Sequence, residues 1–146
     1  MSESPPSSDS TRSLDWKNAL LTPLKLFAPW LAAVIVVSLA GYSGVVCVTP
    51  LAWLLALRVG NVCVLRSASP NASQRLAEAG LGGAVLGFLQ GFLFWIVVPY
   101  MGPIRPDEQV NAALLGAAMI GLGIVAGAVL ALFTGYLMER KLRTQS

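Results

Sequence analysis

The stretch that decides the fold reads GLGIVAGAVLALFTG and covers residues 121–135. It contains no charged residue, and a small residue recurs at every fourth position: Gly123, Gly127, Ala131 and Gly135. Residues four apart lie on one face of an α-helix, so the segment predicts an apolar helix with one smooth face. Glycine lowers helix propensity by about 1 kcal/mol relative to alanine. Its regular use therefore indicates a packing role.

The composition of the whole chain indicates an integral membrane protein. Of its 146 residues, 55% are hydrophobic and only 12% are charged, and the mean hydropathy is +0.69. In soluble domains about a quarter of the residues are charged, so the fraction of charged residues in this chain is about half the usual value. Residues 26–57 and 109–138 contain no charged side chain. An apolar segment of about 18 residues can cross a bilayer, and we therefore predict an all-α membrane protein.

The apolar segments predict a bundle of four transmembrane helices. As one helix, residues 26–65 would measure about 60 Å, twice the hydrocarbon thickness of about 30 Å, so they are expected to fold back. A turn-forming GYSG cluster and the Thr49-Pro50 pair, which favours a helix start, place the turn within 41–50. The third and fourth crossings are expected over residues 80–100 and 110–138.

The distribution of positive charge predicts the orientation of these crossings. Lys and Arg collect on cytoplasmic segments, and here they lie in the N-terminal segment, in the 66–79 loop and at the C-terminus. The 101–109 loop holds one arginine beside two acidic residues, and the 41–50 turn holds no charge. Four crossings put all three basic segments on one side, with both termini cytoplasmic. Three crossings would put one basic terminus on the opposite side.

The N-terminal residues divide into two parts. Residues 1–13 are rich in Ser and Pro, cannot bury apolar area, and are predicted to form a disordered tail. In residues 14–25, a tryptophan and two leucines fall at helical spacing among charged residues. This segment fits a short amphipathic helix in the headgroup region, and it fits an extension of the first crossing equally well. The transmembrane domain is expected over residues 26–143.

A second ridge of small residues predicts which helices pack together. The third crossing carries Ala79, Gly83, Gly87 and Gly91 at intervals of four. In lipid, helices associate by close backbone approach, which small side chains allow. We therefore predict that the third and fourth crossings are antiparallel neighbours that pack ridge against ridge. A contact with another subunit and a chance pattern are the alternatives, because glycine is frequent in membrane helices.

Polar residues in and beside the crossings are the candidate functional positions. Arg58 is the one ionisable residue expected inside a crossing, and we predict that it snorkels to the interface, where Glu78 and Glu139 are candidate partners. An anion, a lipid headgroup or a partner subunit is the alternative ligand of this arginine. Gln90 and Asn61 are predicted to be buried polar residues. For Gln90 an interhelical hydrogen bond is favoured over a pore-lining or ligand role.

The residue types and motifs that the sequence lacks exclude several kinds of chemistry. The chain has no histidine, which excludes histidine-ligated haem, histidine bases and histidine-rich zinc sites. Cys47 and Cys63 would lie about 24 Å apart on one helix, too far for a disulfide. No phosphate-binding loop or clustered carboxylates occur. We therefore expect no catalytic residues, no metal site, no cofactor and no enzyme activity. The net charge of +3 comes mostly from the residues that set the topology, and it does not indicate nucleic-acid binding.

Two functional hypotheses follow. The first is a non-catalytic accessory or structural subunit that packs through its Gly/Ala ridges with itself or with a larger membrane complex. The alternative is an oligomeric pore, channel or small transporter, including a holin-like pore-former, in which Gln90, Arg58 and Asn61 would line a path. The expected partners are the lipid bilayer and either further copies of the chain or a membrane complex. The expected location is a bacterial cytoplasmic membrane, as a multi-pass protein.

Overall fold

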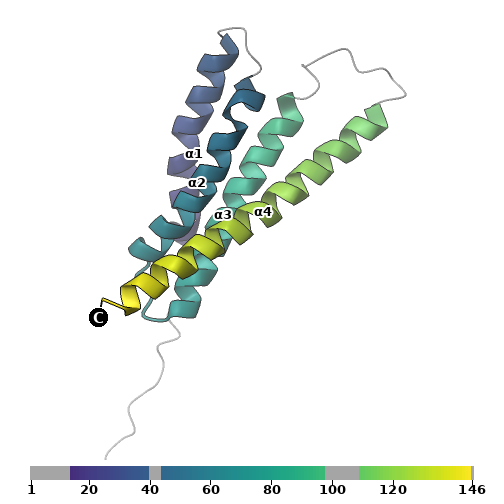
Figure 1. Cartoon of the computed structure of the whole chain (residues 1–146). Helices are drawn as coiled ribbons and strands as arrows, with labels where there is room; N and C mark the ends of the chain where they lie inside the picture. The colour runs from purple at the N-terminus through teal and green to yellow at the C-terminus, as the bar shows by residue number, and fades with distance from the viewer. Residues whose placement is uncertain (1–13, 40–43, 98–108, 146) are drawn as a thin grey trace, which may run out of the picture.

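The computed structural model of the chain describes residues 14–39, 44–97 and 109–145. These residues contain no strand and form four α-helices (Figure 1): α1 (Trp16–Leu39), α2 (Gly44–Arg66), α3 (Ala72–Val97) and α4 (Gln109–Arg143). The all-helical fold predicted from the sequence is confirmed. The predicted N-terminal tail and residues 101–108 of the predicted loop lie outside the described residues.

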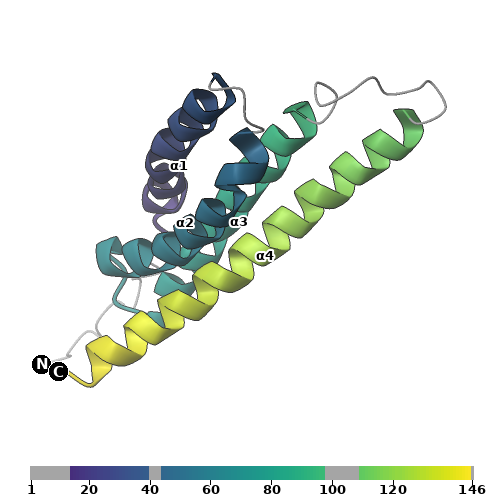
Figure 2. The same ribbon diagram turned by 45° about the horizontal axis from the view of Figure 1, so that its top comes forward.

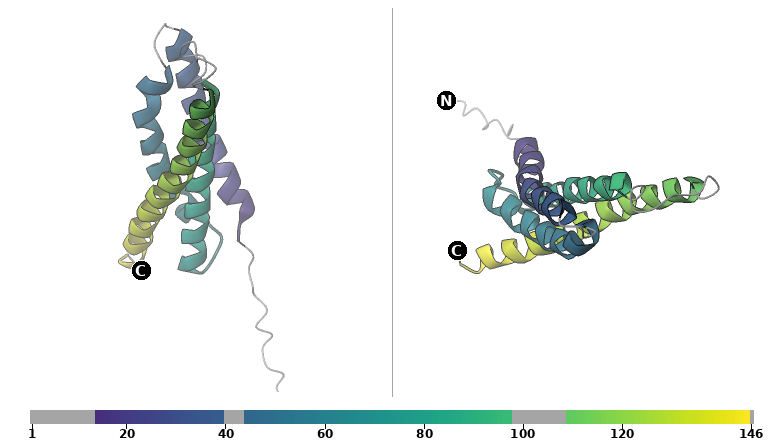
Figure 3. Two further views of the ribbon diagram at one scale, coloured as in Figure 1. Left: turned by 90° about the vertical axis from the view of Figure 1, so that its right-hand side faces the viewer. Right: turned by 90° about the horizontal axis from the view of Figure 1, so that it is seen from above.

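The four helices run alternately up and down. α1 packs against α2 and α3, and α4 packs against α3 and α2. α4 crosses the other helices obliquely and separates from α3 toward its Gln109 end (Figures 1 and 2). The start of α1, the end of α2, the start of α3 and the end of α4 lie at one end of the bundle (Figure 3). We call this end the polar end.

Three of the helices are long and apolar enough to cross a membrane. The qualifying segments among the described residues are Trp16–Val37, Ala72–Ile96 and Ala113–Arg143. Only 11% to 39% of the residues in their most apolar windows are buried inside the protein. The other residues of these windows are partly or fully exposed. These are the features of a helical membrane protein.

The structure joins residues 16–25 and the first apolar segment into one helix. Residues 16–25 continue directly into the apolar segment as α1, which passes through Pro23 and Pro29. Proline has no N–H to donate, so Pro23 deprives the carbonyl of Ala19 of its helical donor. That carbonyl faces Gly82 of α3, where an added Cβ would lie 3.4 Å from it. The segment is thus an extension of the first helix, with α3 packed closely against it.

The boundaries of the other helices differ from those predicted from the sequence, and the differences lie at polar residues. α2 begins at Gly44, so Thr49 and Pro50 lie inside this helix and not at its first turn. α3 begins earlier than expected, at Ala72, and α4 continues to Arg143. Hydropathy detects the apolar part of a helix and cannot detect its continuation into charged sequence. At about 1.5 Å per residue, the 35 residues of α4 measure about 52 Å.

The core is built mainly from small side chains, while many large ones lie outside. One buried cluster joins α2, α3 and α4 and a second joins α1 and α2; their members are Ala56, Val59, Cys63, Val64, Ala79, Leu86 and Ala131, and Trp30, Val34 and Ala52. On α4, Leu114, Val125, Val129 and Phe133 are all more than half exposed. Apolar side chains on the outside are stable in lipid, because acyl chains are as apolar as leucine.

Candidate functional site

α3 and α4 meet through the two ridges of small residues. We call this contact the α3–α4 seam; it consists of Gly83, Gly87 and Gly91 of α3 and Gly123, Gly127 and Ala131 of α4. A Cβ atom added to Gly87 would lie closer than 3.0 Å to the backbone carbonyl of Gly123. One added to Gly83 would meet the carbonyl of Gly127 in the same way. At these positions only a hydrogen atom fits between the two backbones.

The seam extends toward the polar end and there includes α2. Gly135 of α4 lies against Ala79 of α3 and Val64 of α2, and a Cβ added to it would be 3.1 and 3.2 Å from their side chains. On α2, Gly60 faces the backbone carbonyl of Ala131 so closely that an added Cβ would clash with it. The sequence analysis did not single out Gly60, although Ala52, Ala56 and Gly60 of α2 also recur at intervals of four.

The two polar residues predicted to be buried lie where helices meet. The Nε2 atom of Gln90 on α3 donates a hydrogen bond to the carbonyl oxygen of Ala52 on α2, at 3.3 Å. Asn61 is partly buried on α2 and lines a cavity of about 190 Å³ together with residues of α4. The amide of Asn61 makes no hydrogen bond with any described residue. Gln90 therefore joins two helices, whereas the amide of Asn61 forms no such link among the described residues.

The structure gives Glu139 partners other than Arg58. Arg58 is exposed on α2 and forms no ion pair within the described part of the chain. Glu139 is buried near the end of α4; its Oε1 atom lies 3.0 Å from Nη2 of Arg75 and 3.6 Å from Nε of Arg143. Because Arg75 belongs to α3, this ion pair joins α3 to α4 at the polar end. Glu139 therefore serves a helix contact, and the snorkelling of Arg58 stays a prediction.

Glu78, the other acidic residue considered as a partner of Arg58, is fully buried and binds α1. Its Oε1 atom accepts from the backbone N–H of Asp15 at 3.1 Å, and Oε2 accepts from Nδ2 of Asn18 at 3.4 Å. Nδ2 of Asn18 also donates to the carbonyl of Cys63 on α2 at 3.2 Å, and Oδ1 accepts from the hydroxyl of Thr22 at 3.0 Å. We call Asp15, Asn18, Thr22 and Glu78 the α1 anchor, because they hold the start of α1 against α2 and α3.

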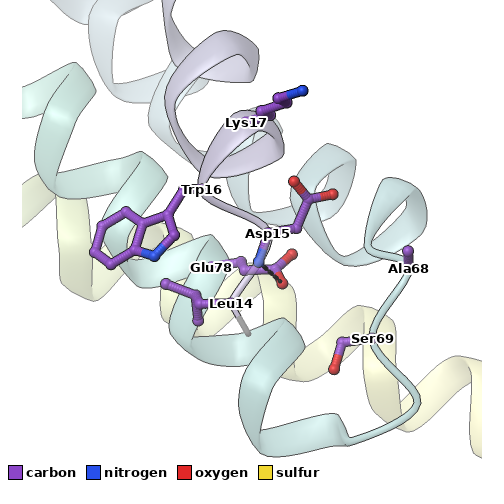
Figure 4. A pocket seen from close by; sticks show the side chains of 7 residues that line it. All are labelled: Leu14, Asp15, Trp16, Lys17, Ala68, Ser69 and Glu78. Carbon is purple, nitrogen blue, oxygen red and sulfur yellow. Dashed lines mark hydrogen bonds between the residues drawn. The ribbon is translucent and has the colours of Figure 1, made fainter. Parts of the chain in front are cut away.

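A cavity of about 480 Å³ adjoins the α1 anchor (Figure 4). It is lined by the start of α1, the connection between α2 and α3, and Glu78: Leu14, Asp15, Trp16, Lys17, Ala68, Ser69 and Glu78. Both carboxylate oxygens of Glu78 already accept hydrogen bonds from the anchor. Among the described residues, no group of three or more His, Cys, Asp or Glu side chains could hold a metal ion. The described residues of the cavity therefore offer no cluster of this kind for a metal ion.

The sequence analysis placed Glu78 at the interface but gave no reason to join it to α1. Asn18 and Thr22 belong to a segment that fitted a surface helix, so nothing marked them as buried partners. One local signal was present. The backbone N–H of Asn18 donates to Oδ1 of Asp15 at 3.0 Å, as in a helix N-cap, and Asp15 followed by Trp16 therefore marks the true start of α1.

Comparison with known proteins gives no match to a family model, to a curated protein or to a solved structure. The contacts described above are therefore the basis for a functional argument. They fall into three groups: the α3–α4 seam, the two buried acidic contacts at the polar end, and the cavity beside Asn61.

Proposed function

We propose that this protein is a non-catalytic membrane subunit that packs through its helices with itself or with a larger membrane complex. The observation that carries the proposal is the outward surface of α4. This helix is the longest of the four, yet only 11% of the residues in its most apolar window are buried inside the protein. The small residues of α4 form its side of the α3–α4 seam, and a long apolar face of the same helix is left for other helices or for lipid.

The state of the polar groups favours a subunit over a pore. A water-filled path needs polar groups in line on an open face. Here Gln90 is bound to Ala52, and the hydroxyl of Thr134 donates to the carbonyl of Leu130 in its own helix at 3.0 Å. Arg58 and Asn61 are the two candidates of the pore hypothesis that make no polar side-chain contact within the described part of the chain.

Four crossings with both termini cytoplasmic, in a bacterial cytoplasmic membrane, form part of the proposal. α2 packs beside α1 and α3, and its 23 residues measure about 35 Å, enough to span the hydrocarbon core. The polar end gathers the start of α1, the α2–α3 connection and the end of α4 (Figure 3). These are the three segments rich in Lys and Arg, so the positive-inside rule assigns this end to the cytoplasm.

Purification of the tagged chain in mild detergent tests the subunit hypothesis. We expect other membrane proteins to co-purify in fixed stoichiometry, or a discrete homo-oligomer, and we expect liposomes containing the protein to retain an entrapped fluorescent dye. A homo-oligomer that releases the dye would instead establish the pore. A strictly monomeric chain without partners would contradict both hypotheses.

Cysteine labelling tests the four crossings. In a variant without Cys47 and Cys63, single cysteines are introduced at Ser69 and in the 101–109 loop. A membrane-impermeant maleimide added to intact cells should label the second position, and it should label Ser69→Cys only after the membrane is opened. Labelling of both positions from the same side would refute the topology.

A further inference from the structure

The cavity between α2 and α4 near the polar end combines polar and apolar walls. Its volume is about 190 Å³, and it is lined by Asn61 of α2 and by Thr134, Leu137, Met138 and Lys141 of α4. Lys141 lies close to the end of the segment of α4 that could span a membrane. Thr134 lies two turns deeper along the same helix. The cavity therefore extends inward from the level where lipid headgroups would lie.

The charge around this cavity is positive and not neutralised. No acidic residue lines it, and the side chain of Lys141 forms no ion pair with a described residue. Glu139, two residues away, binds Arg75 and Arg143. Arg58, likewise without an ion pair among the described residues, lies three positions before Asn61, on the same face of α2. The cavity thus has the charge that suits an anion.

The hydrogen-bonding groups of the cavity include donors that suit a ligand with acceptor oxygens. The hydroxyl of Thr134 donates to the carbonyls of Leu130 and Ala131 in its own helix. The amide of Asn61, in contrast, has no partner within the described part of the chain. An amide without a partner is unfavourable at the edge of lipid. A phosphate group would accept from Asn61 and pair with Lys141 at the same time.

We propose that this cavity binds the headgroup of an anionic phospholipid. The phosphate lies between the ammonium of Lys141 and the amide of Asn61, and the acyl chains continue over Leu137 and Met138 to the outer surface of α4. Basic pockets between helices at the cytoplasmic surface have the chemistry that such headgroups require. This assignment needs only that the polar end reaches the headgroup region, and it is independent of the subunit role proposed above.

Native mass spectrometry of the full chain tests the site. The protein is purified in a neutral detergent and titrated with dioleoylphosphatidylglycerol or dioleoylphosphatidylcholine. We expect one phosphatidylglycerol to be retained in preference to phosphatidylcholine. Lys141→Gln should weaken its binding about fivefold, the effect of one basic residue near an anionic headgroup. Asn61→Leu, which removes the amide and keeps its size, should weaken it about tenfold, the effect of a hydrogen bond to a charged group.

Arg140→Gln is the matched control, because Arg140 is exposed beside Lys141 and does not line the cavity. It should change phosphatidylglycerol binding less than twofold, within the scatter expected for a charge outside the site. Equal losses in Arg140→Gln and Lys141→Gln would overturn the proposal, as would equal retention of the two lipids. Displacement of the lipid by inorganic phosphate would assign the site to a free anion instead. If Asn61→Leu does not fold, the comparison of Lys141→Gln with Arg140→Gln still decides.

Discussion

At the scale of single residues, glycines of α4 occupy two very different environments. Gly123 and Gly127 face the backbone of α3 so closely that no Cβ would fit. Gly121, two residues before the first of these, has nothing within 4 Å of the position that its Cβ would take. Glycine is therefore required sterically at Gly123 and Gly127, whereas at Gly121 it only lowers the helix propensity.

Alanine substitutions should separate these two environments. Gly87→Ala places a methyl group against the carbonyl of Gly123, and we expect the free energy of unfolding to fall by about 1–3 kcal/mol, the usual cost of overpacking. Gly121→Ala meets open space, and we expect no loss, or a gain of up to about 1 kcal/mol from helix propensity. Unfolding by SDS in mixed micelles, followed by circular dichroism, measures both.

An equal response of the two variants would contradict the packing of the α3–α4 seam. The distinction between these positions could be predicted from sequence, because Gly123 and Gly127 belong to the interval of four and Gly121 does not. The contact of Gly60 with Ala131 could not. Gly60 follows Ala52 and Ala56 at intervals of four, but which helix this face of α2 meets depends on how α2 is rotated about its axis.

At the scale of elements, α1 is held by polar groups at its start rather than by apolar packing alone. Glu78 is fully buried, although it has no cation within hydrogen-bonding range among the described residues. Its charge is compensated by donors from Asp15 and Asn18. A buried carboxylate is stable only when its oxygens are hydrogen-bonded, so α1 and the start of α3 depend on each other.

Removal of one donor should loosen α1 selectively. In Asn18→Ala, one oxygen of Glu78 loses its donor, and the carbonyl of Cys63 loses one of two donors, because it also accepts from the backbone N–H of Ser67. We expect a loss of about 2–3 kcal/mol in stability, as for hydrogen bonds to a charged group. Hydrogen–deuterium exchange should become faster over the first turns of α1 and stay unchanged in the middle of α4.

Lys17→Ala is the control for this measurement, since Lys17 is exposed and adjacent to Asn18. Its effect should stay within about 0.5 kcal/mol, as for most surface substitutions. Faster exchange of α1 in both variants, or in neither, would show that the α1 anchor does not hold this helix.

The elements themselves illustrate what sequence patterns can predict. Long apolar segments predicted the apolar parts of α1, α3 and α4 because hydropathy depends only on local composition. The start of α3 was placed too late, because Arg75 and Glu78 look like loop residues until their partners are known. Those partners, Glu139 on α4 and Asn18 on α1, are far away in sequence. Their pairing depends on helix rotation and register, which a single sequence does not encode locally.

At the scale of the whole molecule, the apolar side chains are distributed in the reverse of a soluble bundle. Small residues fill the contacts between helices, and Leu114, Val129 and similar side chains point outward. In water such a surface would drive aggregation. In a bilayer this surface contacts acyl chains, which are equally apolar. The depth of a residue in the membrane should therefore decide which substitutions it tolerates.

Lysine substitutions on the outer face of α4 test this arrangement. Val129 and Leu114 are 58% and 65% exposed, but Val129 lies near the middle of the candidate span and Leu114 at its beginning. Val129→Lys should make insertion of α4 less favourable by about 2.5–3.5 kcal/mol, as at a helix centre. Leu114→Lys should have a much smaller effect, because its ammonium can reach the headgroups. A reporter of helix insertion measures the two, and equal effects would argue against a membrane-spanning α4.

The α1 anchor also imposes an order on the making of the protein. Asn18 and its acceptor Glu78 are separated by 60 positions, and Arg75 and Glu139 by 64. When α1 has just been synthesised, the carboxylate of Glu78 that binds it has not yet been translated, and Arg75 of α3 in turn has no partner until α4 is made. Early in biogenesis the polar first turns of α1 therefore lack their partners, and the contacts of the bundle are complete only after α4 has been made.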